Sequence, residues 1–411
     1  MSITFIQEPN LFASGFDPLV FLASSNQTTQ PNFRYRIQVL NASGSVVAEF
    51  RKPPYYADGT CDFDAHRTVE NYLSYDISNL IAGTIGFKKG VNVYNRYTIN
   101  IGEEYGSTPS LQASANSNFR YAVNASMDYL KWVNTPINSL SYQSIVGTSG
   151  TFLTYAPNPI VLRESDSYEL GFISFGTDSC EAMRVTTYNA SGTQLKQSVF
   201  NNPFKTNANN DEHFLSMLVG AANLNSWTVS SGSAQPLITG SVETYKVELI
   251  GGISGTNPIS DVRTFKIDRD CTRDGNYNRL FWLNSLGRFD AFNFTQLPDD
   301  MIEVEKSDYN KLPFVRTSSG ITYSAYSNER SNFFNKSKQK YSLRSGYVDT
   351  ATSVWLKELV QSPLVYMLIN GQFVAVNVTS TSYQAKTTIM DKLFNIQLDI
   401  ELANDTYRQR L

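Results

Sequence analysis

Residues 277–294, YNRLFWLNSLGRFDAFNF, are the most aromatic stretch of the chain. Two runs of large side chains flank the short loop Asn284-Ser-Leu-Gly287, which ends in the residue that most readily takes a positive φ. Large rings on both runs would pack across a strand pair, each buried ring contributing about 1.5–3 kcal/mol. The stretch therefore predicts a β-hairpin, in which Trp282 either belongs to a sheet core or stays exposed to stack on sugars or fill a partner's pocket.

The composition favours strands and turns over helices. Aromatic residues make up 13% of the 411-residue chain, with 24 Tyr and 25 Phe, and charged residues only 17%. The net charge of −3 provides no basic surface for nucleic acid, so we expect no sequence-specific nucleic-acid binding. The length predicts two or three domains, large enough to bury their cores without a metal or a disulfide.

The cysteines and the N-terminus indicate a reducing compartment. Cys61, Cys180 and Cys271 are odd in number and far apart, which favours reduced thiols over a disulfide framework. The start, MSITFIQEPNLF, has no basic region followed by a sustained apolar core, and no apolar run is long enough to cross a bilayer. We therefore expect a protein made in the cytoplasm that has no membrane partner.

Turn signals and alternating runs predict a mainly β, multi-domain protein. We expect two β-sandwich units of the immunoglobulin or fibronectin kind, followed by a C-terminal β-rich module with a few short helices. The predicted divisions are 1–106 for the first sandwich, 107–164 for a connector, 165–270 for the second sandwich and 271–411 for the C-terminal module.

The motif Asn-Ala-Ser-Gly occurs between paired strand candidates in both sandwiches, at 41–44 and 189–192. A proline follows each of these hairpins, and the repetition is weak evidence for an internal duplication. In the second unit Asp211 is a candidate N-cap, because Phe214, Met217, Leu218 and Ala221 follow it at helical spacing. The sequence thus predicts a helix at this point.

The C-terminal module contains the clearest local signals. Asn370-Gly371 predicts a tight hairpin between 364–369 and 372–378, and strict alternation predicts a half-buried strand over 394–402. A helix from Asp349 or Thr350 to Val360 should end before Pro363. The polar stretch 317–340 is interpreted as a long exposed loop or arm.

No catalytic constellation is visible. His66 and His213 lie in no metal-ligand spacing, and the acidic stretch 268–276 fails the spacing of a calcium loop. A hydrolase of cell-wall glycan would need facing carboxylates, whereas Glu103-Glu104 and Asp299-Asp300 are neighbours that point to opposite faces of a strand. We expect no enzyme activity, no catalytic residue, no metal and no cofactor.

Three segments carry a resemblance to a known group: FWLNSLGRFDAFNF, INIGEEYG at 99–106, and residues 355–404. Together they resemble structural proteins of tailed phages that infect Bacteroidetes, crAss-like phages among them. The resemblance implies a virion protein of the neck or tail, assembled in the host cytoplasm. The C-terminal helix–hairpin–strand module also looks like tail-tube and tail-hub domains, a likeness of fold alone. It also implies a ring of identical subunits around the DNA conduit, with further tail or neck proteins on its portal side and tail-tip side.

The expected mode of action is assembly, through interface residues that include Trp282, Arg288 and Phe289 of the hairpin and Tyr407, Arg408 and Arg410 of the C-terminal tail. The C-terminal residues of the chain are interpreted either as a frayed end or as an arm that adds to a neighbouring subunit by strand pairing. Two other functions stay open: a distal-tail or baseplate adaptor for receptor-binding fibres, and a sandwich module that binds host glycans through exposed aromatic rings.

Overall fold

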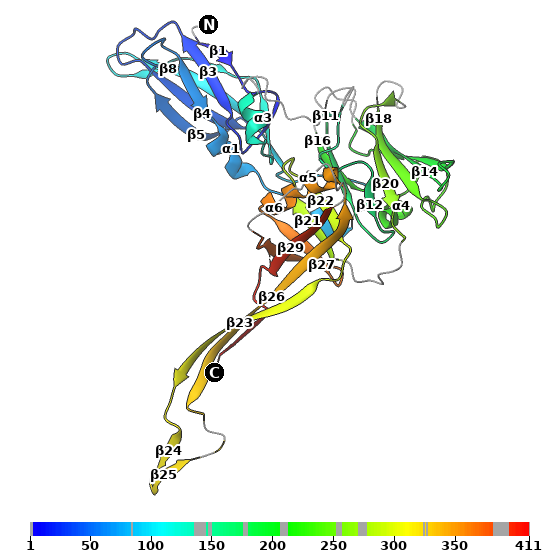
Figure 1. Cartoon of the computed structure of the whole chain (residues 1–411). Helices are drawn as coiled ribbons and strands as arrows, with labels where there is room; N and C mark the ends of the chain where they lie inside the picture. Colours follow the sequence, from blue (N-terminus) through cyan, green and yellow to red (C-terminus); the bar gives the residue numbers. More distant parts are fainter. Residues whose placement is uncertain are drawn as a thin grey trace. The chain divides into compact units, whose positions relative to one another are not determined.

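The computed structural model describes residues 3–83, 85–134, 145–146, 150–175, 180–205, 213–251, 257–269, 278–323, 325, 328–380 and 394–410. Strands dominate and the helices are short, which confirms the predicted mainly β, multi-domain fold (Figure 1). Contacts divide the chain into two compact units. Unit 1 comprises Met1–Arg269 and Leu283–Asp290, and unit 2 comprises Asp270–Trp282 and Ala291–Leu411.

The first half of unit 1 is a β-sandwich. One sheet has the order β1-β3-β6 and the other β2-β10-β8-β4-β5, with β9 also on β8. The strands are distributed between the two sheets as in an immunoglobulin-type sandwich. Its elements are β1 (Ile3–Gln7), β2 (Phe12–Ser14), β3 (Val20–Ser25), β4 (Arg34–Asn41), β5 (Val46–Lys52), β6 (Cys61–Asp64), α1 (His66–Val69), α2 (Ser78–Ala82), β7 (Phe87–Lys89), β8 (Tyr94–Tyr105), β9 (Ser110–Asn116) and β10 (Arg120–Val123).

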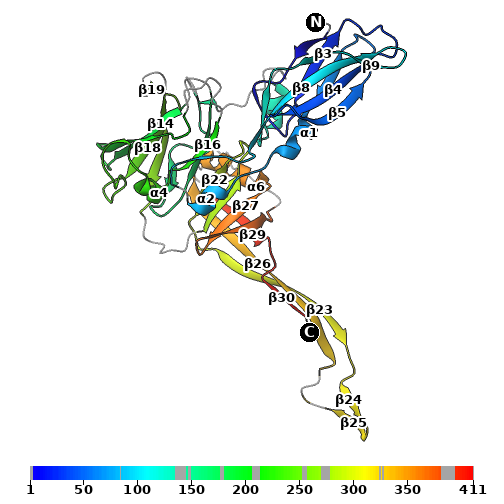
Figure 2. The same cartoon turned by 180° about the vertical axis from the view of Figure 1, so that it is seen from behind.

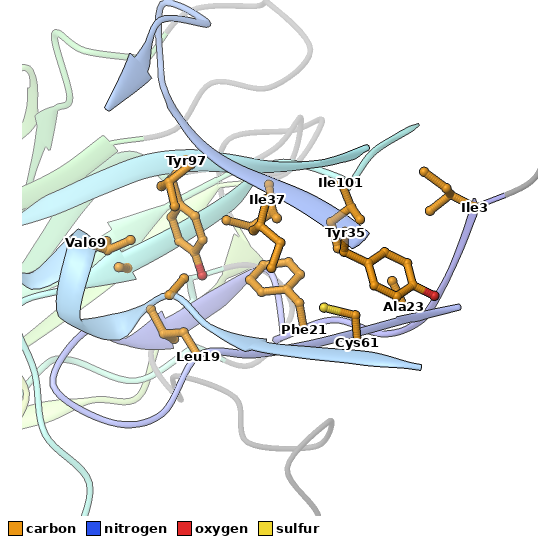
Figure 3. Packing of buried hydrophobic residues seen from close by; sticks show 14 of the residues in the cluster. Ile3, Leu19, Phe21, Ala23, Tyr35, Ile37, Cys61, Val69, Tyr97 and Ile101 are labelled. Carbon is orange, nitrogen blue, oxygen red and sulfur yellow. The ribbon is translucent and has the colours of Figure 1, made fainter. Parts of the chain in front are cut away.

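The core of this sandwich follows directly from alternation along its strands. In β4 every second residue is buried, so that Tyr35 and Ile37 point inward. Figure 3 shows these side chains meeting Phe21 of β3 between the two sheets. The rings of Phe21 and Tyr97 meet edge to face with their centroids 6.2 Å apart.

The second half of unit 1 repeats this architecture. Its larger sheet has the order β12-β20-β18-β14-β15-β17. In both halves the larger sheet begins with a parallel pair, β2 with β10 in the first half and β12 with β20 in the second. The smaller sheet has the order β11-β13-β16-β7, so β7 of the first half completes it. Its elements, after α3 (Tyr129–Asn134), are β11 (Ile145–Val146), β12 (Ile160–Leu162), β13 (Glu169–Ser174), β14 (Cys180–Tyr188), β15 (Gln194–Asn201), β16 (His213–Leu218), α4 (Ala221–Ser226), β17 (Ser231–Gly232), β18 (Thr244–Gly251), β19 (Asn257–Pro258) and β20 (Arg263–Ile267).

The repeated Asn-Ala-Ser-Gly turn has the same geometry in both halves. Asn41 Oδ1 accepts hydrogen bonds from the backbone N–H groups of residues 43 and 45, at 3.1 and 2.9 Å. Asn189 Oδ1 accepts the equivalent bonds from residues 191 and 193, at 3.1 and 2.8 Å. Gly44 and Gly192 have φ of 81° and 79°, which other residues adopt only with strain. The sequence repeat is therefore also a structural repeat.

Unit 2 is built on a sheet with the order β22-β21-β27-β28-β29-β26-β23, and β30 also pairs with β26. Short helices α5 and α6 precede β27. The elements of this part of the chain are β21 (Asn278–Leu283), β22 (Phe289–Phe294), β23 (Asp299–Asn310), β24 (Phe314–Thr317), β25 (Gly320–Tyr323), β26 (Arg330–Val348), α5 (Thr350–Trp355), α6 (Lys357–Gln361), β27 (Val365–Ile369), β28 (Gln372–Val378), β29 (Phe394–Leu402) and β30 (Tyr407–Arg410).

Several local predictions for the C-terminal part are confirmed. The aromatic stretch forms a hairpin whose turn residue Gly287 has φ of 80°. Asn370 and Gly371 join β27 to β28 with φ of 50° and 76°, as a two-residue hairpin turn requires. Asp349 caps α5 by accepting a hydrogen bond from the N–H of Thr352 at 2.8 Å.

One prediction is wrong. The helix expected after Asp211 is a strand, β16, and the helix α4 begins only at Ala221. The strand β16 lies between β13 and β7, and residues 214–218 are all buried. A short continuous apolar run of this kind contains helical spacings by chance. The stretch 317–340, interpreted from the sequence as a long exposed loop or arm, is exposed over much of its length and contains β25 and the start of β26.

Candidate functional site: the exposed arm

The most distinctive surface of unit 2 is a long β-ribbon, here called the arm. It consists of the antiparallel ladder of β23 with β26, the hairpin β24–β25 at its tip and the strand β30. The ladder runs from the pair Asp299–Ser342 to the pair Asn310–Arg330. Figures 1 and 2 show this ribbon extending beyond the ends of β27 and β29 of the same sheet.

The arm has apolar side chains on both faces without a core beneath them. On β23 the neighbours Met301 and Ile302 point to opposite faces and are 49% and 65% exposed. At the tip Tyr323 is 75% exposed, and Leu312, Val315 and Ile321 are exposed as well. Where β30 does not flank β26, the arm is a two-stranded ribbon. Such a ribbon is at best marginally stable in water, because it buries little apolar area. The exposed apolar residues of the arm are therefore suited to contact with a partner.

Ion pairs across the ladder keep the arm in register. Lys340 Nζ lies 2.6 Å from Glu303 Oε2, and Arg344 binds Asp299 at 2.5 Å. Near the tip Arg330 pairs with Asp308. The hydrogen bond from Lys340 lowers the pKa of Glu303 below its ordinary value. Exposed pairs of this kind add little stability, so their main effect is on the alignment of the two strands.

The strands at the two sides of the arm carry opposite charges. The edge strand β23 has five acidic residues and one lysine: Asp299, Asp300, Glu303, Glu305, Asp308 and Lys306. On the other side, β26 contains lysine and arginine but no acid, and β30 has the sequence YRQR. Within the described residues, β23 and β30 each pair with β26 alone among the strands. The arm therefore offers two chemically different strand edges.

The hairpin residues predicted at an interface are buried within the chain. Trp282 is 0% exposed, and its ring lies 4.9 Å from that of Trp355 in the core of unit 2. Phe289, which belongs to unit 1, is 2% exposed, and the centre of its ring lies 6.3 Å from that of Tyr75 in the same unit. The aromatic stretch thus forms sheet core, and the side chains of Trp282 and Phe289 present no surface to a partner or a sugar.

Arg288 is also buried, at 2% exposure, inside unit 1. Its guanidinium carbon lies 5.7 Å from the centre of the Phe214 ring, and its side chain fills the space beside Gly90 and Gly171. Burial raises the pKa of the nearby Glu169 carboxyl, although the charge of Arg288 opposes this shift. Arg288 therefore anchors the hairpin turn in unit 1 by packing and by charge.

The C-terminal residues predicted at an interface belong to the arm. Tyr407, Arg408 and Arg410 lie on β30, which pairs antiparallel with Phe334–Ser337 of its own chain. Tyr407 is 51% exposed. Sequence reasoning missed β23, the partner strand of the arm. The signal was present in MIEVEK at 301–306, where Ile302 and Val304 alternate with charged residues.

The other candidates for chemistry have structural partners. His66 Nδ1 lies 2.8 Å from Asp64 Oδ2, and Cys61 and Cys180 are buried free thiols. Burial raises the pKa of Cys61 to about 11. Cys271 and residues 270–276 of the acidic stretch lie outside the described residues.

Glu103 and Glu104 point to different partners, as their adjacency predicted. Glu103 accepts a hydrogen bond from Ser25 Oγ at 2.5 Å, whereas Glu104 binds Arg34 at 2.6 Å. In the described part of the chain, no three His, Cys, Asp or Glu residues cluster as a metal site would require. None of the described helices combines the length and the apolar character needed to cross a membrane.

Comparisons with known proteins add no identification. Neither the known protein-family models nor the curated proteins contain a match to this chain.

Proposed function

We propose that the protein is a structural subunit of a phage virion that forms a ring in the tail or neck around the DNA conduit. It acts by assembly and not by catalysis. Its partners are copies of itself and the tail or neck proteins on the portal side and the tail-tip side. Assembly takes place in the host cytoplasm, and the protein then remains in the tail of the virion.

The observation that carries the proposal is the arm. Its ladder pairs twelve residues of β23 with β26, and its tip exposes Leu312, Val315 and Tyr323 to solvent. A surface of this kind gains stability when it is covered, since exposed apolar side chains and open strand edges both favour association. The two compact sandwiches of unit 1 would then serve as the bulk of the subunit. The resemblance of the sequence to phage structural proteins supports the same conclusion.

A virion protein of the neck or tail can be located directly. Gold-labelled antibodies against the purified protein should bind the neck or tail of particles of the phage that encodes the chain, seen by electron microscopy. Tailless capsids from the same preparation are the control and should stay unlabelled. Label on the capsid shell, or virions without the protein, would contradict the proposal. Label confined to the tail tip would favour the adaptor for receptor-binding fibres.

A second candidate, glycan binding, has one observation in its favour. In the loop between β5 and β6 the rings of Tyr55 and Tyr56 lie 4.9 Å apart, and Tyr56 is 91% exposed. Gly59 N–H donates to the carbonyl of Tyr55 and thereby closes the loop. Exposed rings of this kind can stack on a sugar. Binding of the protein to a glycan array that is lost in Tyr56→Ala would support this function, and no binding at millimolar sugar would exclude it.

A further inference from the structure

We propose that β23 of one subunit pairs in parallel with β30 of a second copy, with Glu305 next to Arg408. This inference rests on the self-assembly in the proposed function and identifies the surfaces through which it occurs. The two copies would join their arms, edge strand to edge strand, into one continuous sheet.

The registers of the two ladders define the expected alignment. Lys336 of β26 pairs with Glu305 of β23 on one side and with Arg408 of β30 on the other. Phe334 likewise pairs with Ser307 and with Arg410. Both flanking strands are antiparallel to β26, so they are parallel to each other. A second arm can be placed with its β30 beside β23 of the first arm, without a shift along the strands. Arg408 of the second copy is then level with Glu305 of the first copy.

The backbone of β23 is suited to accept another strand. An edge strand presents a row of N–H and C=O groups that its own sheet does not use. Soluble proteins usually protect such edges with short strands, prolines, bulges or charged side chains, and of these β23 has chiefly the charges. From Asp299 to Ser307 the strand β23 pairs without interruption, and its one bulge lies between Ser307 and Asp308. No proline occurs in the strand.

The acidic residues of β23 determine which strand of a second copy can pair with its edge. Two copies of β23 placed side by side would bring acidic residues against acidic residues, which is destabilising. The strand β30 carries arginine at 408 and 410 and no acid, so it is complementary. Among the acids of β23, Asp299, Glu303 and Asp308 already have cationic partners within the chain. Among the residues whose side chains the structure describes, none forms an ion pair with Glu305, so we take Glu305 as the partner for a neighbouring copy.

The geometry of the contact predicts the type of assembly. Since β23 and β30 are different surfaces, each subunit would use one to bind the next copy and the other to bind the previous one. Such heterologous contacts produce a closed ring when the rotation between subunits closes, and a filament when it does not. A four-residue strand is too small for a stable interface by itself. The exposed side chains of Met301, Ile302 and Val304 would therefore be covered in the same contact.

Cysteine cross-linking tests the pairing directly. Within one chain, positions 305 and 408 lie on opposite sides of β26, about 9–10 Å apart at the usual strand spacing. Cα atoms more than about 7 Å apart cannot be bridged by a disulfide, so a link between these positions must join two copies. The double variant Glu305→Cys, Arg408→Cys, made in a Cys271→Ser background, should give a ladder of oligomers on a non-reducing gel. Each single variant should give at most dimers, and the background protein should run as a monomer on this denaturing gel, where non-covalent contacts are lost.

Charge reversal provides the second measurement. Glu305→Arg and Arg408→Glu should each weaken self-association at least about tenfold, and the double reversal should restore it. Glu70→Arg, which lies in unit 1, is the control and should leave association unchanged. If the native protein forms oligomers that neither reversal affects, and no ladder appears, the pairing of β23 with β30 is wrong while self-assembly stands. If the native protein remains monomeric at high concentration, self-assembly itself is wrong.

Discussion

Val304 of β23 and Tyr407 of β30 pair with the same residue, Ser337 of β26, from its two sides. The last strand of the chain thus makes part of the arm three-stranded. Next to this position the backbone of Thr406 donates to the carbonyl of Ser337 at 2.9 Å, and Lys336 lies 3.4 Å from Asp405. These contacts fix β30 on the arm within a single chain.

Removal of β30 should separate folding from assembly. A chain ending at Asp405 loses the strand Tyr407–Arg410 but keeps the ladder between β23 and β26 and the core of unit 2. We expect near-native circular dichroism and an unfolding midpoint within a few degrees of the full chain, together with loss of self-association. Analytical ultracentrifugation measures the second property. Unchanged oligomers in the truncated chain would show that β30 is not part of the interface.

Gly171 should tolerate no side chain. A Cβ at this position would lie 2.6 Å from Cγ and 2.8 Å from Nε of Arg288, whose buried side chain cannot move aside. Overpacking of this kind costs about 1–3 kcal/mol, so Gly171→Ala should lower the unfolding midpoint of unit 1 in urea. Gly240→Ala is the matched control, because nothing lies within 4 Å of the place that its added methyl group would occupy. Equal midpoints for the two variants would contradict the packing of Arg288 against Gly171.

Glu104 should stabilise unit 1 in a pH-dependent way. Burial alone would raise the pKa of its carboxyl, but hydrogen bonds from Arg51 and Arg34 outweigh this and lower the pKa. A lowered pKa in the folded state stabilises the protein above the ordinary glutamate pKa of about 4.3, and the effect is lost as the pH falls through the folded value. Glu104→Gln should therefore cost about 1–2 kcal/mol at pH 7, because the arginines are partly exposed.

The same comparison at lower pH provides the check on Glu104. The difference in unfolding free energy between Glu104→Gln and the native protein should shrink as the pH falls below about 4.3, and it should be lost once the pH has passed through the lowered pKa of Glu104 in the folded state. Urea titrations at several pH values measure it. A difference that stays constant over this range would show that the charge of Glu104 does not contribute.

Asp349 should stabilise the start of α5 through its side chain. Its carboxylate accepts a hydrogen bond from the N–H of Thr352 at 2.8 Å, and α5 packs Trp355 against Trp282 in the core. Asp349→Ala should destabilise unit 2 by about 0.5–2 kcal/mol, as is usual for loss of an N-cap. Asp349→Asn keeps the acceptor and should cost much less. If both variants lowered the stability of unit 2 equally, the stabilisation would come from the charge of Asp349 and not from its hydrogen bond to Thr352.

The sequence was informative where local chemistry decides the structure. Asn370-Gly371 and Gly287 occupy turns that require positive φ, so these hairpins follow from residue type. The strand β29 alternates between buried and exposed residues because only one face of its sheet is covered. The repeated turns at Asn41 and Asn189 were equally clear, since each joins two paired strands.

The parts that could not be predicted depend on tertiary contacts. The strand β16 is buried on both faces, so it shows no period that separates it from a helix. The arm is exposed on both faces, and its polar residues therefore resemble a loop. The burial of Arg288 depends on Gly171 and Phe214, more than 70 residues away. For this reason a charged hairpin residue was expected on the surface.

The most direct test of self-assembly is the native mass of the purified full-length protein, with negative-stain images of the same sample. Self-assembly into a ring predicts a discrete oligomer with a fixed number of subunits, visible as closed rings. A population that remains monomeric as the protein concentration is raised would contradict it.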